Sequence, residues 1–226
     1  MVRRYFATAL QLSPSGRIEY GMTADSVGYA LLADFQEDYL AADFPGVLSA
    51  LQSARGLILD VRQRRGGSVP NIDAVVSRFL TAPLARPAFY VLGRRVDWAP
   101  IQPQGPLTYT RPVVVLINGS TFSAGEHFAE WMKALPNVTA VGDTTGGGGV
   151  ASTTDVPCEH RLPSGKLICV GAGDLRRYDG QPVEWLGVPP DVRVPQTVQD
   201  IRAERDPQLT YALALLRGAA ARTAGR

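Results

Sequence analysis

The sequence predicts a single α/β domain built around a β-sheet, and three observations support this fold class. Apolar runs typical of strands alternate with segments of helical periodicity through the first two thirds of the chain. One run, VVVLI at Val113–Ile117, is apolar at every position, which is typical of a central strand covered on both faces. No internal repeat or linker divides the 226 residues, so we expect one domain.

Taken in order, the predicted core begins with the strand SVGYALLADF at 26–35 and continues with the strand GLILDVR at 56–62. The second strand leaves through the turn QRRGGS into a helix, and a proline-rich excursion at 83–110 follows. Helices are also predicted at 44–54, 71–80 and 207–216, and further strands at 88–92, 138–142, 151–161, 166–171 and 174–178. We expect a lead-in at 1–25, the core domain at 26–216 and a C-terminal tail at 217–226.

The segment after VVVLI has the spacing of a helix with one apolar face. That face is predicted to pack against the core. Its residues are Phe128, Trp131, Met132 and Leu135.

Composition excludes several classes of protein and partner. The chain is 45% hydrophobic and 19% charged, which is typical of a globular protein rather than a disordered or fibrous one. A net charge of +2 is too small to indicate nucleic acid as a partner. No apolar run approaches the roughly 18 residues of a membrane span, and MVRRYFATALQLSPSG lacks the apolar core and cleavage site of a signal peptide.

The two cysteines, Cys158 and Cys169, flank the turn-like LPSGK and could face each other across a hairpin. A disulfide there would favour an extracytoplasmic location, whereas two buried free thiols are the alternative. Two cysteines and two histidines at these spacings do not form a zinc site, so no metal is predicted. The GGGG run at 146–149 lacks the lysine and Ser/Thr of a phosphate loop, which favours a flexible loop and no cofactor.

The segment NGSTFSAGEH at 118–127 carries the first candidate for catalysis. A nucleophilic serine is often placed at a sharp strand-to-helix turn, where N–H groups of the helix start can stabilise an oxyanion. Alternatively, Ser123 caps the helix and Glu126 completes a capping box. Taken alone, the segment favours the cap.

A second strand-to-helix turn contains Gly66 and Gly67. Either glycine could present a backbone N–H to a reacting carbonyl oxygen, as the second half of an oxyanion hole. On its own, a Gly-Gly pair after a strand indicates only a turn.

Taken together, four motifs in order resemble those of the tail-specific (C-terminal processing) serine proteases. DVRQRRGG is similar to the D-L-R-G-N-G-G-G of that family, and VLINGSTFSAGE to its V-L-V-N-x-x-S-A-S-A-S-E. VGDTTGGGG corresponds to V-G-E-x-T-x-G-K-G, and EWLGVPPD to E-x-x-G-V-x-P-D. The resemblance extends over 26–216, so this segment is identified as a protease-like catalytic core.

The resemblance implies a crotonase-like (Clp/crotonase) α/β fold, a serine-type peptidase activity and a peptide or protein substrate. The sequence leaves open whether the chain forms a homo-oligomer. It makes Ser123 the nucleophile and assigns the oxyanion donors to the N–H groups of Ala124 and of Gly66 or Gly67. The alternative is a catalytically inactive module that binds a peptide or an apolar ligand.

The general base is where the sequence departs from this pattern. One branch of the family uses a lysine at the position of Gly148, which excludes that base here. The other branch resembles the tricorn core protease and the interphotoreceptor retinoid-binding protein, and uses an upstream histidine oriented by a glutamate that corresponds to Glu184.

No histidine precedes His127, and only His160 follows it, so these two are the candidates within the chain. For His127 a buried core position is the favoured interpretation, and for His160 a surface strand. We therefore expect the chain to be the catalytic core of a longer protein whose upstream segment supplies the base.

Overall fold

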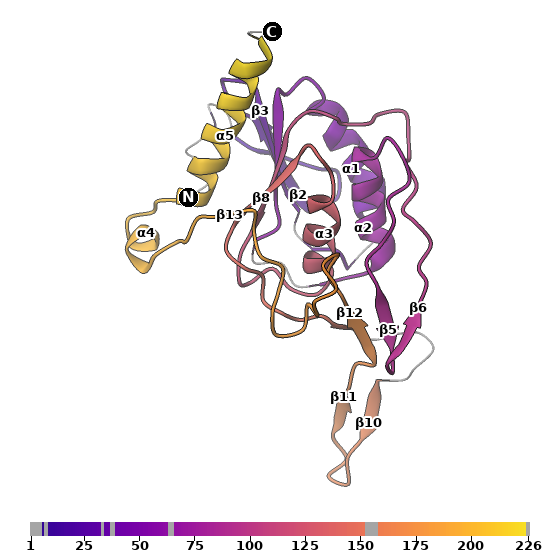
Figure 1. Cartoon of the computed structure of the whole chain (residues 1–226). Helices are drawn as coiled ribbons and strands as arrows, with labels where there is room; N and C mark the ends of the chain where they lie inside the picture. The colour runs from indigo at the N-terminus through magenta and orange to yellow at the C-terminus, as the bar shows by residue number, and fades with distance from the viewer. Residues whose placement is uncertain are drawn as a thin grey trace.

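A seven-stranded sheet forms the centre of the computed structural model, which describes residues 6, 9–32, 34–36, 39–62, 66–151 and 158–224 (Figure 1). The strands lie in the order β1-β2-β3-β4-β7-β8-β13. Neighbours from β3 to β13 are parallel, and β1 and β2 are added antiparallel at one edge. The strands are β1 Gln11–Leu12, β2 Ile18–Met22, β3 Val27–Leu32, β4 Gly56–Asp60, β7 Val113–Ile117, β8 Val138–Gly142 and β13 Val192–Arg193.

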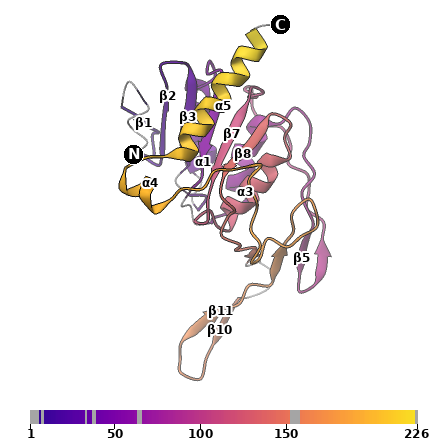
Figure 2. The ribbon, with the colours of Figure 1, turned by 60° about the vertical axis from the view of Figure 1, so that its left-hand side comes forward.

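Helices cover both faces of this sheet (Figures 1 and 2). Helices α1 (Tyr39–Ala50), α2 (Val69–Val76) and α3 (Ala124–Lys133) cover one face, and a 3₁₀ turn at Ser77–Phe79 extends α2. Helix α5 (Pro207–Ala224) covers the other face. The α/β class predicted from the alternation of strands and helices is therefore confirmed.

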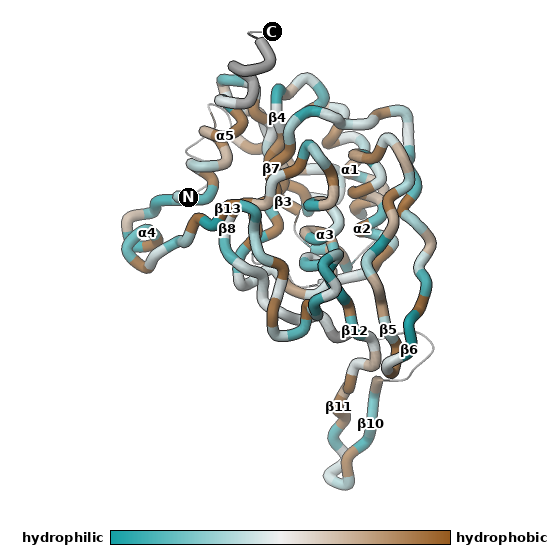
Figure 3. Tube along the Cα trace, viewed as in Figure 1, coloured by the Kyte–Doolittle hydropathy of each residue, from teal (hydrophilic) through white to brown (hydrophobic). Residues whose placement is uncertain are grey.

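Strand β7 explains why VVVLI is apolar throughout. Val113, Val115 and Ile117 pack into the core beneath α1–α3, whereas Val114 and Leu116 pack beneath α5. Alternate side chains of a strand point to opposite faces, so a strand buried on both faces must be apolar at every position. Hydrophobic residues accordingly follow the central strands in Figure 3.

The predicted apolar face of α3 is also confirmed. Phe128, Trp131 and Met132 are fully buried, and Leu135 just beyond the helix is 8% exposed. The helix therefore sits firmly on the sheet, and its first residue follows directly from the turn that leaves β7.

A smaller sheet of order β6-β5-β12-β9 lies below the main one (Figure 1). Its strands are β5 Phe89–Val91, β6 Arg94–Val96, β9 Val150–Ala151 and β12 Gly173–Leu175. The β5–β6 hairpin is the structure formed by the proline-rich excursion. Residues 152–157 of the strand predicted at 151–161 lie outside the described part of the chain.

A hairpin of β10 (Glu159–Arg161) and β11 (Leu167–Cys169) projects from the body (Figures 1 and 2). Cys158 and Cys169 form a disulfide at its base, so the alternative of two free thiols is not found.

Several short or weakly patterned elements are not predicted by the sequence. Strand β2 lies within the predicted lead-in, and α4 (Val198–Arg202) has no buried residue to mark its periodicity. Helix α5 runs to Ala224 rather than ending at 216. Within the described residues, no helix combines the length and the apolar character needed to cross a bilayer.

Candidate active site

Ser123 lies at the sharp turn between β7 and α3, and its backbone is strained. Its φ of 52° and ψ of −117° fall in a region that residues other than glycine rarely occupy. The preceding Thr121 is fully buried and donates a hydrogen bond of 3.0 Å to the carbonyl of Val61, at the end of β4. The turn is therefore fixed to the neighbouring strand, which can support the strain at Ser123.

Glu126 connects this turn to a second loop. Its buried carboxylate accepts four hydrogen bonds: Oε1 from Thr145 Oγ1 (2.6 Å) and the N–H of Gly147 (2.7 Å), and Oε2 from the N–H groups of Gly148 (2.8 Å) and Ser123 (3.0 Å). Burial raises the pKa of the Glu126 carboxyl, and these donors oppose that rise. The capping interaction predicted for Glu126 is thus one part of a larger network.

The turn with Gly66 and Gly67 lies directly against Ser123. A Cβ atom added to Gly66 would lie 3.1 Å from Ser123 Oγ and 3.9 Å from the backbone nitrogen of Ala124. Both glycines have positive φ, 49° and 149°, and a Cβ on Gly67 would collide with the backbone of Phe35 at 2.0 Å. Glycine is therefore required here by both conformation and space.

The N–H groups around Ser123 differ in their availability. The N–H of Gly66 donates to the carbonyl of Phe122 at 3.0 Å. In the described part of the chain, the N–H groups of Gly67 and Ala124 have no backbone acceptor. Of the two glycines considered from the sequence, Gly67 is therefore the one whose N–H has no backbone acceptor within the described segments.

The turn that carries these glycines begins at a buried ionic network. Arg62 pairs with Asp60 (2.7 Å) and with Asp206 (2.9 Å), and it donates to Gln208 at 3.1 Å. Tyr29 donates to Asp60 at 2.9 Å. Although burial disfavours the charge, the two carboxylates raise the pKa of Arg62. The network joins the end of β4 to the start of α5.

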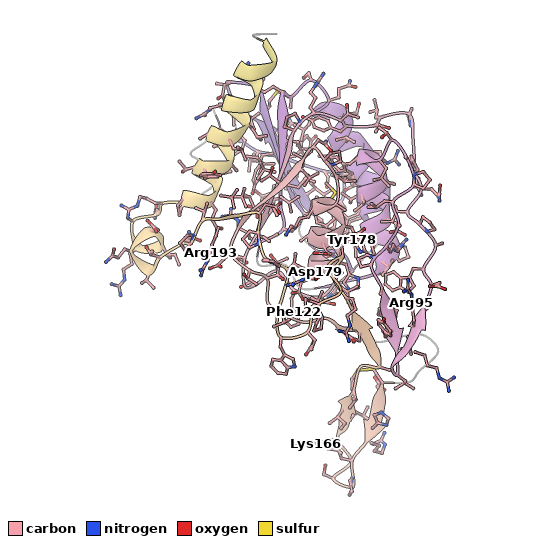
Figure 4. All side chains as sticks on the ribbon, viewed as in Figure 1. Arg95, Phe122, Lys166, Tyr178, Asp179 and Arg193 are labelled. Carbon is pink, nitrogen blue, oxygen red and sulfur yellow. A yellow bond between two sulfur atoms is a disulfide. The ribbon has the colours of Figure 1, made fainter. Side chains whose placement is uncertain are left out.

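Two glycines of the GGGG run lie beneath the ring of Phe122. A Cβ on Gly146 would approach the ring to 2.5 Å, and one on Gly148 would approach it to 2.1 Å. Phe122 is 44% exposed and lies on the body of the protein, away from Lys166 on the projecting hairpin (Figure 4).

The other two glycines of the run face the EWLG segment. A Cβ on Gly147 would lie 2.9 Å from the backbone of Trp185, and one on Gly149 would lie 2.6 Å from the backbone nitrogen of Glu184. Because the run is covered on alternate sides, every position excludes a side chain. The run is held by these contacts and by Glu126, which the sequence alone did not indicate.

Glu184 is partly buried at the edge of this arrangement. The N–H of the next residue, Trp185, donates to the carbonyl of Gly147 at 2.9 Å. The structure thereby brings the Glu184 segment, the glycine run and the Ser123 turn into one connected group.

The two histidines lie outside this group. His127 is buried on α3 against Trp98 and Trp131, with ring centroids 6.1 and 5.6 Å away. Burial, assisted by the charge of Arg86, lowers the pKa of His127 to about 4, and its Nδ1 has no partner among the described residues. His160 is exposed on the projecting hairpin, where it pairs with Ile168 across the strands.

Comparison with known proteins agrees with this arrangement. The model of peptidase family S41 matches residues 26–194 of the chain. This chain belongs to peptidase family S41. The S41 assignment confirms the resemblance to the tail-specific serine proteases that the four sequence motifs indicated.

Relatives of this S41 chain are named as tricorn protease homologs and as carboxyl-terminal-processing proteases. It is 36% identical over 167 residues to tricorn protease homolog 1 of Streptomyces coelicolor, covering 71% of this chain and 14% of that protein. It is 28% identical over 221 residues to the carboxyl-terminal-processing protease of Synechocystis, covering 94% of this chain and 49% of that protein. The chain thus spans half or less of the length of these relatives.

Solved structures show the same architecture. A Parabacteroides merdae protein assigned as a peptidase superposes with a TM-score of 0.81 at 28% identity, over 95% of this chain and 68% of that one. The tricorn protease superposes with a TM-score of 0.64 at 26% identity, over 86% of this chain and 18% of that one.

Proposed function

We propose that this chain is the catalytic core of a serine peptidase that cleaves peptide bonds through an acyl-enzyme on Ser123. The observation that carries the proposal is the position of Ser123. Its hydroxyl lies at a strained turn, 3.1 Å from the Cβ position of Gly66 and beside the N–H groups of Gly67 and Ala124, for which the described residues supply no backbone acceptor. Peptide or protein substrates follow from membership of the S41 peptidases.

In this mechanism Ser123 Oγ attacks the carbonyl carbon of the scissile bond, and its proton passes to a base. The negative charge that develops on the carbonyl oxygen is stabilised by the N–H groups of Ala124 and Gly67. The C–N bond then breaks, the amine takes up the proton, and water hydrolyses the resulting ester. Glu126 supports the step by holding the backbone of Ser123.

The base is proposed to be a histidine supplied by another part of a longer protein, with Glu184 orienting it. The two histidines of this chain are poorly suited, because His127 is packed among indole rings and His160 lies on the projecting hairpin. The short span of this chain relative to its relatives supports the same inference. We further propose the crotonase-like arrangement for the fold, and a homo-oligomer for the assembly.

Labelling with a fluorophosphonate probe tests the proposal. We expect slow covalent modification that mass spectrometry locates on Ser123, and none in Ser123→Ala. Ser120→Ala, at an exposed position of the same turn, is the matched control and should label like the native chain. Equal labelling of Ser123→Ala would refute the assignment. Absence of labelling, even when upstream residues are supplied, would favour a protein that binds peptides without cutting them.

A further inference from the structure

We propose that Trp185 is a substrate-contact residue which binds an apolar side chain of the peptide, and that Phe122 contacts the same peptide next to Ser123. The inference rests on the proposed function, because it concerns the peptide that would react at Ser123. It deepens that function by naming what the site recognises: an aliphatic or aromatic side chain close to the scissile bond.

The conformation of Trp185 is the first observation. Its φ is 64°, a left-handed value that is unfavourable for a bulky residue, and its side chain is 88% exposed. An indole is seldom left so open to water, because it can bury a large apolar area. The strain is thus not offset by packing of the ring within the chain, which points to a ligand as the partner of the indole.

The second observation is how firmly the backbone of Trp185 is held. Its N–H donates to the carbonyl of Gly147, and a Cβ on Gly147 would collide with its backbone at 2.9 Å. Two residues on, Gly187 donates to the carbonyl of Val183 at 2.8 Å and closes the turn. A rigid backbone that presents an open indole is pre-organised for contact, since little backbone entropy is lost on binding.

The third observation is the position of Phe122 on the other side of the glycine run. Its ring covers Gly146 and Gly148, and 44% of the residue remains exposed. Phe122 directly precedes Ser123 in the chain, so a peptide that reacts at Ser123 must pass close to this ring.

The apolar character of the exposed side chains near Ser123 indicates the class of ligand. Trp185 and the adjacent Leu186 (49% exposed) are both apolar, as is Phe122 on the opposite side of the glycine run, and neighbouring large apolar side chains that are left exposed mark a binding surface. Aromatic side chains are frequent binding hot spots because they remove a large apolar area from water. A peptide with leucine or phenylalanine near the scissile bond would fit this surface, whereas one with aspartate or serine would gain little from it.

The test is peptide binding in a Ser123→Ala background, which removes catalysis from the measurement. Fluorescein-labelled hexapeptides that differ at a single position, with Leu, Phe, Ser or Asp, are titrated and followed by anisotropy. Trp185→Ala, Trp185→Phe and Phe122→Ala are compared. Leu92→Ala is the matched control, because Leu92 is also exposed (72%) and has a positive φ of 47°, but it lies in the β5–β6 turn.

We expect Trp185→Ala to weaken binding of the Leu and Phe peptides at least fivefold and to leave the Ser and Asp peptides within twofold. Trp185→Phe should restore most of the loss, Phe122→Ala should act in the same direction, and Leu92→Ala should have no effect. Equal affinity of Trp185→Ala and the parent for every peptide would overturn the inference. Equal weakening for all four peptides, or no binding to the parent, would overturn it as well.

The result of this binding test can be distinguished from the result of the fluorophosphonate test of the proposed function. Failure of Ser123 to react with the fluorophosphonate would refute the peptidase while leaving selective binding at Trp185 intact. Labelling of Ser123 without any dependence of binding on Trp185 would do the reverse.

Discussion

The carboxylate of Glu126 accepts a hydrogen bond of 3.0 Å from the backbone N–H of Ser123. The same carboxylate holds Gly147 and Gly148, so one buried side chain fixes both the strained turn and the glycine run beside it. Loss of this carboxylate should therefore disturb the turn and the glycine run together.

Glu126→Gln should be strongly destabilising although it preserves the shape of the side chain. Each carboxylate oxygen accepts two hydrogen bonds, so the amide NH₂ of glutamine must face two donors. We expect a loss of about 2–4 kcal/mol in the free energy of unfolding, since buried donors are left unpaired. Urea denaturation measures the loss, and fluorophosphonate labelling of Ser123 should fall with it.

Glu130→Gln is the matched control for this substitution. Glu130 is also buried on α3, but among the described residues its carboxylate accepts one hydrogen bond, from the N–H of Tyr178 at 2.7 Å. The amide oxygen can still accept that bond, so the loss should stay below about 1 kcal/mol. Equal losses for the two variants would contradict the role given to Glu126.

Gly148→Ala should be destabilising because its methyl group would overlap the ring of Phe122 at 2.1 Å. The ring is partly exposed and can move, so we expect a cost of about 1–2 kcal/mol. Phe122→Ala in the same chain should remove most of this cost, and a double-mutant cycle measures the coupling. Gly218→Ala, with no atom within 4 Å of its Cβ position in α5, should instead stabilise the chain by up to about 1 kcal/mol.

Arg62→Met should cost about 3–5 kcal/mol, because it leaves buried carboxylates without their cation. Asp60 and Asp206 both pair with Arg62 at the junction of β4 and α5. Arg95→Met removes an exposed pair with Asp97 (side chains 65% and 92% exposed) and should change stability by less than about 0.5 kcal/mol. Thermal and urea unfolding compare the two, and a small effect of Arg62→Met would show that the network is dispensable.

His127 should make the folded chain less stable at acidic pH. Its pKa in the fold is about 4 against an ordinary value of 6.5, so between these values the unfolded chain binds the proton more readily. Stability should therefore fall as the pH falls through this window, by about 2 kcal/mol between pH 7 and pH 5. His127→Phe, which suits the surrounding indoles, should remove this part of the pH dependence, whereas the exposed His160→Gln should leave it unchanged.

Trp185→Gly should stabilise the chain while weakening its binding of apolar peptides. Glycine adopts a φ of 64° without the steric cost that tryptophan carries, a difference of about 1 kcal/mol. The indole is 88% exposed, so little packing is lost. A lower melting temperature for Trp185→Gly would show that Trp185 is not strained.

Much of the fold could be predicted from the sequence, because its main elements have strong periodic patterns. The β7 and β8 segments were predicted with the bounds found, since each is an apolar run between turns. The elements missed include β1, β2, β13 and α4, where few residues are buried and the periodic pattern is too short to detect. Helix α5 was predicted too short, because its last turns lack an apolar stripe.

Some features of the candidate site could also be predicted from the sequence, whereas others depend on the tertiary structure. Residue types at fixed spacing were enough to single out Ser123, the glycine pair and Glu184, because a motif is local in the chain. The tertiary structure is needed to show which glycine N–H lacks a backbone acceptor among the described residues, what Glu126 binds and why four consecutive glycines are required. These features depend on segments that are distant in the chain and meet only in the fold. The sequence by itself determined the family and the sheet core, and it singled out Ser123 as the candidate nucleophile. The tertiary structure decided the hydrogen-bond network around that serine and the burial of His127, because hydrogen bonding and burial depend on which surfaces face each other after folding.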